Sequence, residues 1–82
     1  MSPFYTLWKT GSKVNAALTV KMLEDSGKAV RFQVADNEKM TFWVPAKALV
    51  FSDPQQIRIA FWFTPGDFMR NAFDRYANHY NR

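Results

Sequence analysis

The chain has 82 residues, no cysteine, and eleven Lys and Arg against seven Asp and Glu, for a formal net charge of +4. A chain of this length has room for one core and no second domain, because it buries only about 60–65% of its unfolded surface. Without cysteine, neither a disulfide framework nor a Cys-ligated zinc can reinforce that core. Aromatic residues make up 17% of the chain, and large rings are an efficient way for a small domain to bury area.

The N-terminal sequence and the charge bear on location and partners. Residues 1–6 lack the basic start and apolar run of a signal peptide, and no apolar stretch reaches the length of a membrane span. We therefore expect an intracellular protein, most simply a cytoplasmic one from a bacterium or phage. The positive charge favours acidic partners such as nucleic acid, although a modest positive charge is also ordinary for a soluble protein.

The first half of the chain has the pattern of strands. Residues 4–10 read as one strand, with residues 11–12 as the turn after it. Apolar residues alternate at period two from Val14 to Met22, which predicts a half-buried strand. A helix over residues 15–24 is the alternative, since several good helix formers occur there. Residues 24–28 have turn composition, with Gly27 free to take a positive φ.

Three more extended segments are expected after this turn. Residues 29–34 and 40–44 alternate as strands, and Pro45 ends the second because proline cannot donate to a ladder. Residues 46–51 fit either a helical turn or an edge strand. Residues 56–63 show the clearest alternation in the chain, with Ile57, Ile59, Phe61 and Phe63 on one side.

A helix is expected over residues 65–79, with Thr64 as its N-cap and Pro65 at the first helical position. Its apolar stripe repeats at helical spacing and consists of Met69, Ala72, Phe73, Tyr76, Ala77 and Tyr80. The predicted fold is therefore α+β: a small antiparallel sheet of four to five strands, open or partly closed into a barrel. One C-terminal amphipathic helix is expected to pack on one face of this sheet.

Catalytic patterns are missing from the sequence. The single histidine, His79, stands three residues from the C-terminus, in an expected helix end. No serine has the G-x-S-x-G context, and no spacing of His or carboxylates is typical of a metal site. With three glycines, no Gly-rich phosphate cradle can form. We expect a protein that binds a partner without catalysis, with no cofactor and no metal.

One expected sheet face carries cations interleaved with indole rings. If the helix covers the opposite face, this face presents Lys21, Arg31, Trp43, Arg58 and Trp62, with Gln33 and Thr41 between them. Sheet platforms of this type hold single-stranded nucleic acid, because bases stack on rings while Lys and Arg follow the phosphates. The alternative is that both indoles pack inside a barrel or under the N-terminal strand, and that the cations only solvate the surface.

Other uses of these surfaces remain open. The same face could bind a protein, since Trp, Tyr and Arg are enriched in interface hot spots, or could pair with a second copy in a homodimer. A second basic patch is expected from Arg70, Arg75 and Arg82, with Lys9 and Lys13 near the start of the chain. Its alternative interpretation is an ordinary solvated helix face.

Residues 28–34, Lys-Ala-Val-Arg-Phe-Gln-Val, and residues 41–49, Thr-Phe-Trp-Val-Pro-Ala-Lys-Ala-Leu, carry a resemblance. They resemble a hairpin of small phage- and plasmid-encoded proteins that ends in a Trp-Ile/Val-Pro-Lys-Ser-Leu-like sequence. Here Ala46 stands between the proline and the lysine, and Ala48 stands at the polar position. The resemblance implies an origin in a mobile element and raises the possibility of an inhibitor of host defences, similar to anti-CRISPR proteins in size and in lacking catalytic residues.

Two functions are therefore expected, in this order. The first is a binding module that contacts nucleic acid or a nucleoprotein complex through the basic, Trp-bearing sheet face. The second is a protein-binding inhibitor of a host defence system that acts by steric occlusion.

Overall fold

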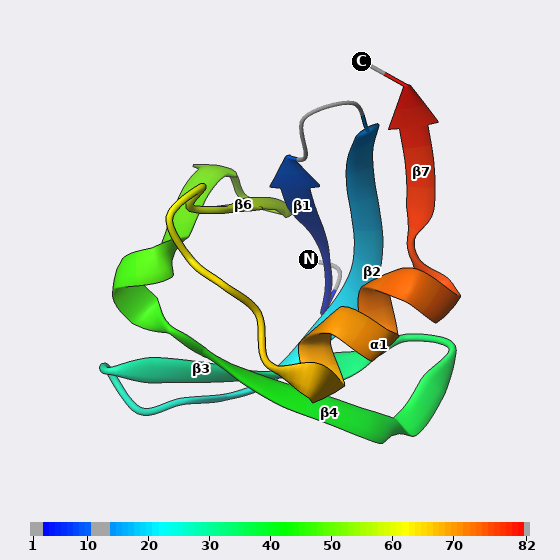
Figure 1. The fold of residues 1–82 in the computed structure, drawn as a ribbon. Helices are drawn as coiled ribbons and strands as arrows, with labels where there is room; N and C mark the ends of the chain where they lie inside the picture. The colour runs from blue at the N-terminus through cyan, green and yellow to red at the C-terminus, as the bar shows by residue number, and fades with distance from the viewer. Residues whose placement is uncertain (1–2, 11–13, 82) are drawn as a thin grey trace.

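The computed structural model describes residues 3–10 and 14–81 and shows an α+β fold, a mixed and largely antiparallel sheet with one C-terminal helix (Figure 1). Its elements are β1 (Phe4–Thr10), β2 (Val14–Asp25), β3 (Ala29–Val34), β4 (Asn37–Pro45), the 3₁₀ turn η1 (Ala46–Ala48), β5 (Leu49–Asp53), β6 (Gln56–Ile59), α1 (Asp67–Tyr76) and β7 (Asn78–Asn81). The predicted fold class is confirmed, but the sheet has more strands than the four to five expected.

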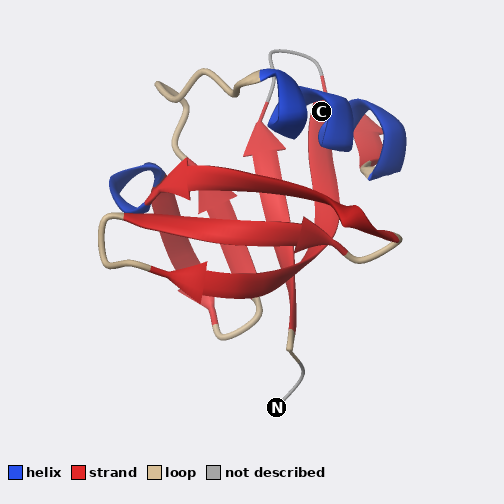
Figure 2. Ribbon diagram, turned by 90° about the horizontal axis from the view of Figure 1, so that it is seen from below, coloured by secondary structure: helices blue, strands red, loops and turns tan. Residues whose placement is uncertain are grey.

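The strand order is β4-β3-β2-β1-β6-β5, and β7 pairs with β2 outside this path. The 12-residue β2 is long enough for two partners on one side: β3 pairs with its C-terminal part and β7 with residues 14–17. The β1–β6 pair is parallel and the other pairs are antiparallel. In Figure 1, β3 and β4 run across the direction of β1 and of the N-terminal part of β2, so the sheet curls around its core but stays open (Figures 1 and 2).

The structure resolves two alternatives that the sequence leaves open. Residues 15–24 form strand and not helix, and residues 46–51 divide into the η1 turn followed by β5. A turn forms within the expected residues 24–28, although β2 continues to Asp25: Gly27 has a φ of 88°, and its N–H donates to Asp25 Oδ1 over 2.9 Å. The expected turn at residues 11–12 lies outside the described residues.

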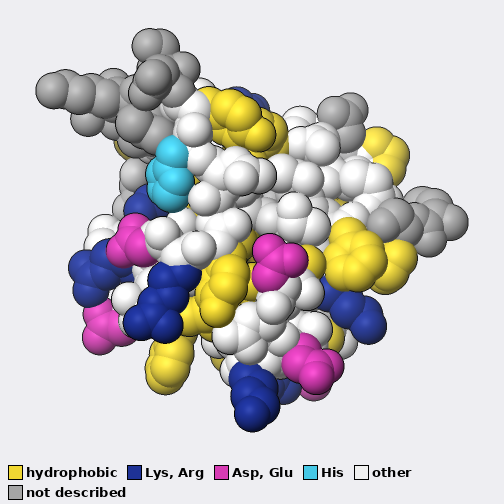
Figure 3. All heavy atoms as spheres, turned by 90° about the vertical axis from the view of Figure 1, so that its right-hand side faces the viewer, with side chains coloured by type: hydrophobic (Ala, Val, Ile, Leu, Met, Phe, Trp, Pro, Cys, Tyr) yellow, Lys and Arg dark blue, Asp and Glu magenta, His cyan; other side chains and the backbone are white. Residues whose placement is uncertain are grey.

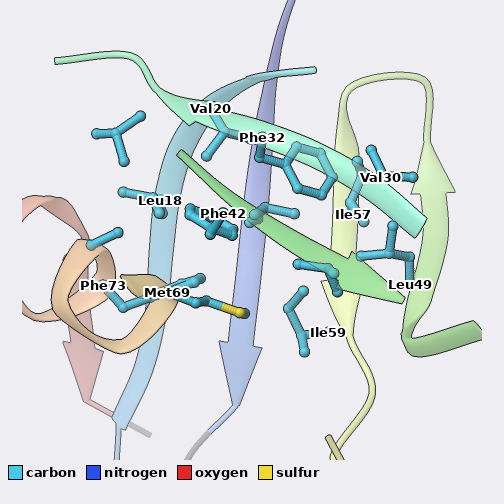
Figure 4. Packing of buried hydrophobic residues seen from close by; sticks show 14 of the residues in the cluster. Leu18, Val20, Val30, Phe32, Phe42, Leu49, Ile57, Ile59, Met69 and Phe73 are labelled. Carbon is cyan, nitrogen blue, oxygen red and sulfur yellow. The ribbon is translucent and has the colours of Figure 1, made fainter. Parts of the chain in front are cut away.

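The core lies on the concave side of the curled sheet (Figure 4). Phe32 and Phe42 face each other from β3 and β4 with ring centroids 6.0 Å apart, and both are buried. From α1, Met69 and Phe73 point towards β2 and β4, and they seal the concave side. The opposite side of the sheet, here called the outer face, is left uncovered by the helix, as predicted.

The helix is shorter than the expected span of residues 65–79. It begins at Asp67 after Gly66, which supplies no side-chain cap, so Thr64 is not the N-cap. It ends at Tyr76 because Ala77 is extended, with a ψ of 148°. Tyr80 therefore belongs to β7 and not to the helical stripe. The N-terminal part of β2 extends beyond the end of β3 and is not paired by it. There β7 pairs with residues 14–17 and satisfies backbone N–H and C=O groups of β2 that would stay unpaired if the helix continued.

The sixth strand is also shorter than expected, since β6 ends at Ile59 and not at residue 63. The Ala60 N–H bonds the Ala48 carbonyl, and the Phe63 N–H bonds the Ala60 carbonyl, which turns the chain towards α1. Phe61, expected to point inward, is 94% exposed as a result. None of the helices in the described part of the chain has the length and apolar content needed to cross a membrane.

Candidate functional site

Four of the five residues expected on the basic sheet face, Lys21, Arg31, Trp43 and Arg58, lie on the outer face. Residues directly opposite each other on paired strands point to the same side of a sheet. Trp43 of β4 lies opposite Arg31 of β3, and Lys21 of β2 lies opposite Gln33 of β3, two residues further along. Arg58 of β6 points to the same face, because it lies opposite Trp8 of the neighbouring strand β1.

Trp43, Arg31 and Lys21, here called the Trp43 cluster, form one corner of the outer face. Trp43 is 47% exposed. The guanidinium of half-buried Arg31 donates to Thr41 Oγ1 over 3.4 Å, which holds it along the sheet surface. Glu24 is the cross-strand partner of Arg31 on β2, and Lys21 is exposed. The corner thus combines a ring that can stack with two cations.

The centre of the outer face is aromatic, which the sequence analysis missed. Trp8 of β1 is half-buried, and its Nε1 donates to Gln56 Oε1 of β6 over 2.5 Å. Its ring lies 5.8 Å from the ring of Tyr80 in β7, and Phe4 on the same face of β1 is 44% exposed. The signal was present, because period-two alternation over residues 4–10 places Phe4 and Trp8 on one side.

The opposite corner holds Arg58 and Trp62. Arg58 is exposed on β6. Trp62 was expected in the same strand, but it lies in the turn that follows β6. Trp62 is 52% exposed and packs edge-on against Phe63, with ring centroids 6.3 Å apart. Thr10, Val50, Arg58 and Trp62 border a shallow hollow of about 400 Å³. The expected set of five residues is therefore divided into two corners of one face.

The distance between the corners follows from the strand register. The partner of Arg31 on β2 is Glu24, whereas Trp8, the partner of Arg58, pairs with Ala17 on the same strand. At roughly 3.3 Å per residue, these two positions lie about 20–25 Å apart along β2. Between them, Phe4 and Trp8 form an aromatic track.

The second expected basic patch is described only in part. Arg70 and Arg75 are exposed on α1, and Arg70 forms an exposed ion pair with Asp67. Figure 3, which views the side of the molecule on the right of Figure 1, shows Lys and Arg interspersed with Asp and Glu. Arg82 and Lys13 lie outside the described residues, while Lys9 is half-buried in β1.

The described residues contain no group of three or more His, Cys, Asp or Glu positioned to hold a metal ion. His79 is exposed in β7, where it lies opposite Ala16 of β2, and not in a helix end as expected. Comparison with known proteins finds no matching family model, no matching curated protein and no matching solved structure.

Proposed function

We propose that the protein is a non-enzymatic binding module that holds single-stranded nucleic acid, free or within a nucleoprotein complex, on its outer face. The observation that carries the proposal is the pairing of exposed Trp43 with Arg31 across β3 and β4, with Lys21 one strand further. Bases stack on exposed rings for about 1–3 kcal/mol each, and this stacking tolerates any base sequence.

The charges on the outer face support the same proposal. Lys21, Arg31 and Arg58 are spread over β2, β3 and β6, so a flexible strand crossing the face meets a cation at each end of its path. Half-buried Trp8, which lies on β1 between them, adds further aromatic surface. Paired bases of a rigid duplex would offer no open faces to these rings, so the surface suits unpaired bases.

Fluorescence anisotropy titration with labelled oligothymidylate and oligouridylate tests the proposal. We expect binding that weakens with salt, with a log–log slope of about −0.7 for each phosphate contacted by a cation. Trp43→Ala should weaken binding about tenfold or more, the loss of one stacked base. An affinity no better than roughly 100 μM at low salt, at the weak end of non-specific binding, would remove nucleic acid as the partner.

A matched variant on the helix serves as the control. Arg75 is exposed on α1, which packs on the concave side of the sheet, and it is not among the residues that line the groove next to Trp43. Arg75→Ala should leave oligonucleotide affinity within about twofold, since a single distant surface charge is largely screened at physiological salt. Equal losses from Arg75→Ala and from Trp43→Ala would show that binding is not localised on the outer face.

A second candidate function is supported by the apolar surface next to Trp62. Val50, Phe51, Phe61 and Trp62 are 43%, 56%, 94% and 52% exposed, respectively, and they follow one another on β5 and in the turn after β6. Exposed apolar clusters of this kind mark protein interfaces. They favour the alternative of a protein-binding inhibitor, similar to anti-CRISPR proteins, that blocks a site on a host defence complex.

Affinity capture from bacterial lysate separates the two candidates. The inhibitor function predicts a stoichiometric protein partner that wild-type protein retains and the double variant Phe61→Ser/Trp62→Ser loses. Nuclease treatment of the lysate is the control, because a partner held only through bound nucleic acid would be released by it. Failure of wild-type protein to retain any stoichiometric protein would exclude the inhibitor function in that host.

A further inference from the structure

The open edge of the sheet at β4 exposes main-chain hydrogen-bonding groups. Bonded and non-bonded residue pairs alternate along an antiparallel ladder. The Ala46 N–H donates to the Lys28 carbonyl over 2.8 Å, so this pair is bonded, and with the observed register the bonded pairs continue through Val44 and Phe42. The N–H and C=O groups of Thr41 and Trp43 therefore point away from β3.

The neighbouring ladder confirms this alternation. The Ala35 N–H donates to the Thr19 carbonyl over 3.0 Å, so Gln33 bonds β2 and not β4. No backbone bond reaches Thr41 or Trp43 from elsewhere in the described residues. An edge with outward N–H and C=O groups is a template on which an extended peptide can add as a further strand.

A groove of about 660 Å³ runs along this edge, between β4 and the first turn of α1. Met40 and Met69 are among the apolar residues that line it, and Phe68, which is 72% exposed, stands at its rim. Successive side chains of an added strand point to alternate faces. One set would enter the groove beside Met40 and Met69, and the other would lie on the side of Trp43, which also lines the groove.

The charges at the groove select the kind of peptide. Arg31 and Lys39 line it, whereas the carboxylate of Asp67, which also lines it, is held by Arg70 in an ion pair. A second copy of the chain would bring the same cations and a net charge of +4 towards this edge, so self-pairing is disfavoured. Acidic side chains instead find two cations, Arg31 and Lys39, for which no ion pair forms within the described part of the chain.

We propose that the β4 edge binds an extended peptide that alternates acidic and apolar residues, added as a strand beside Thr41 and Trp43. The β5 edge is a poorer template, because the Leu49 N–H is already bonded to Ala46 and β5 ends at Asp53, one residue before Pro54. The proposal differs from nucleic-acid binding in its dependence on the main chain of β4 and on Lys39, although both ligands would use Arg31 and lie next to Trp43.

The test uses a capped heptapeptide of alternating glutamate and valine with a central phenylalanine. Binding is followed by amide chemical shifts, and amide hydrogen exchange is measured on the saturated complex. We expect the amides of Thr41 and Trp43 to become protected, because they gain hydrogen bonds only if a strand adds at this edge. The same peptide with lysine in place of glutamate should bind about tenfold more weakly or worse, a loss expected from reversing two charge contacts.

Two variants test the edge itself. Thr41→Pro removes an outward N–H that the sheet does not use, as edge strands allow, and should reduce peptide affinity about tenfold. Lys39→Glu should reduce affinity for the acidic peptide and restore it for the lysine peptide, so the proposal stays testable if the proline variant fails to fold. Unprotected Thr41 and Trp43 amides in the saturated complex, equal binding of both peptides, or dimerisation through β4 without peptide binding would each overturn it.

Oligonucleotide binding is measured in parallel to keep the two proposals apart. Lys39→Glu leaves Lys21, Arg31 and Trp43 intact, so a selective loss of peptide binding would assign the edge to peptide and the outer face to nucleic acid. Protection of Thr41 and Trp43 by oligonucleotide alone, with no peptide binding, would refute the edge proposal without affecting the proposed function.

Discussion

Trp8 and Tyr80 lie on either side of β2 with their ring centroids 5.8 Å apart and their planes inclined by 37°. Ala17 of β2 is the cross-strand partner of Trp8 and is only 7% exposed, yet it is not part of the core cluster. Its burial therefore arises on the outer face, under larger neighbours. The two rings fasten the four-residue β7 to the sheet from the side opposite the core.

Tyr80→Ala should loosen β7 without unfolding the protein. Aromatic pairs contribute about 0.5–1.5 kcal/mol beyond their buried area, so the variant should lose roughly this much stability. Amide hydrogen exchange should quicken in residues 78–81 and stay unchanged in β3 and β4, because only the contact between β7 and β1 is removed. Uniformly faster exchange over the whole sheet would contradict a local fastening role.

Phe32→Ala and Phe61→Ala make the same chemical change at opposite extremes of burial. Phe32 is 0% exposed and Phe61 is 94% exposed. Loss of a buried Phe costs about 3–5 kcal/mol, which is most of the stability of a small domain. We expect urea denaturation to show a large shift of the midpoint for Phe32→Ala, whereas Phe61→Ala should stay within about 0.5 kcal/mol of wild type. Comparable losses would contradict the burial of the two rings.

Gly27→Ala should destabilise the turn between β2 and β3 through the backbone alone. Gly27 has a φ of 88°, and a Cβ added there would meet no atom within 4 Å, so no steric clash contributes. A left-handed conformation costs an L-residue about 1–2 kcal/mol, whereas Asn adopts it more readily. Thermal unfolding should therefore rank wild type above Gly27→Asn and Gly27→Asn above Gly27→Ala. Equal stability of the two variants would show that the turn adapts its φ.

Alternation and turn chemistry predict β2, β3 and β4 well, because each strand has one buried face and each turn has local signals. The misassigned ends have non-local causes. Tyr80 fits the helical stripe by spacing, but an unpaired edge of β2 captures it into β7. Phe61 continues the alternation of β6, but the position opposite it in the β5–β6 register, Lys47, lies in the η1 turn, and the Phe63 N–H bonds the Ala60 carbonyl, so the strand ends. Neither cause can be read from local sequence.

Only part of the candidate site was predicted, because the other part depends on non-local strand pairing. Sequence periodicity places Arg31, Trp43 and Lys21 on one face, since their strands are joined by short turns. The parallel pairing of β1 with β6, which brings Trp8 beside Arg58, joins segments that are 50 residues apart in the chain. No turn signal specifies such a pairing, so the aromatic centre of the face becomes visible only in three dimensions.

The separation of the two corners predicts that the effect of Arg58 depends on ligand length. An oligonucleotide of about four nucleotides, the lower limit for small single-strand sites, can occupy the Trp43 cluster, whereas one of about twelve can extend to Arg58. Arg31→Ala should weaken binding of both, but Arg58→Ala should weaken only the longer one and lower its salt slope by about 0.7. Anisotropy titrations at several salt concentrations measure both quantities. If Arg58→Ala weakens the short oligonucleotide as much as the long one, the bound strand starts at the Arg58 corner and the central role of Trp43 is lost.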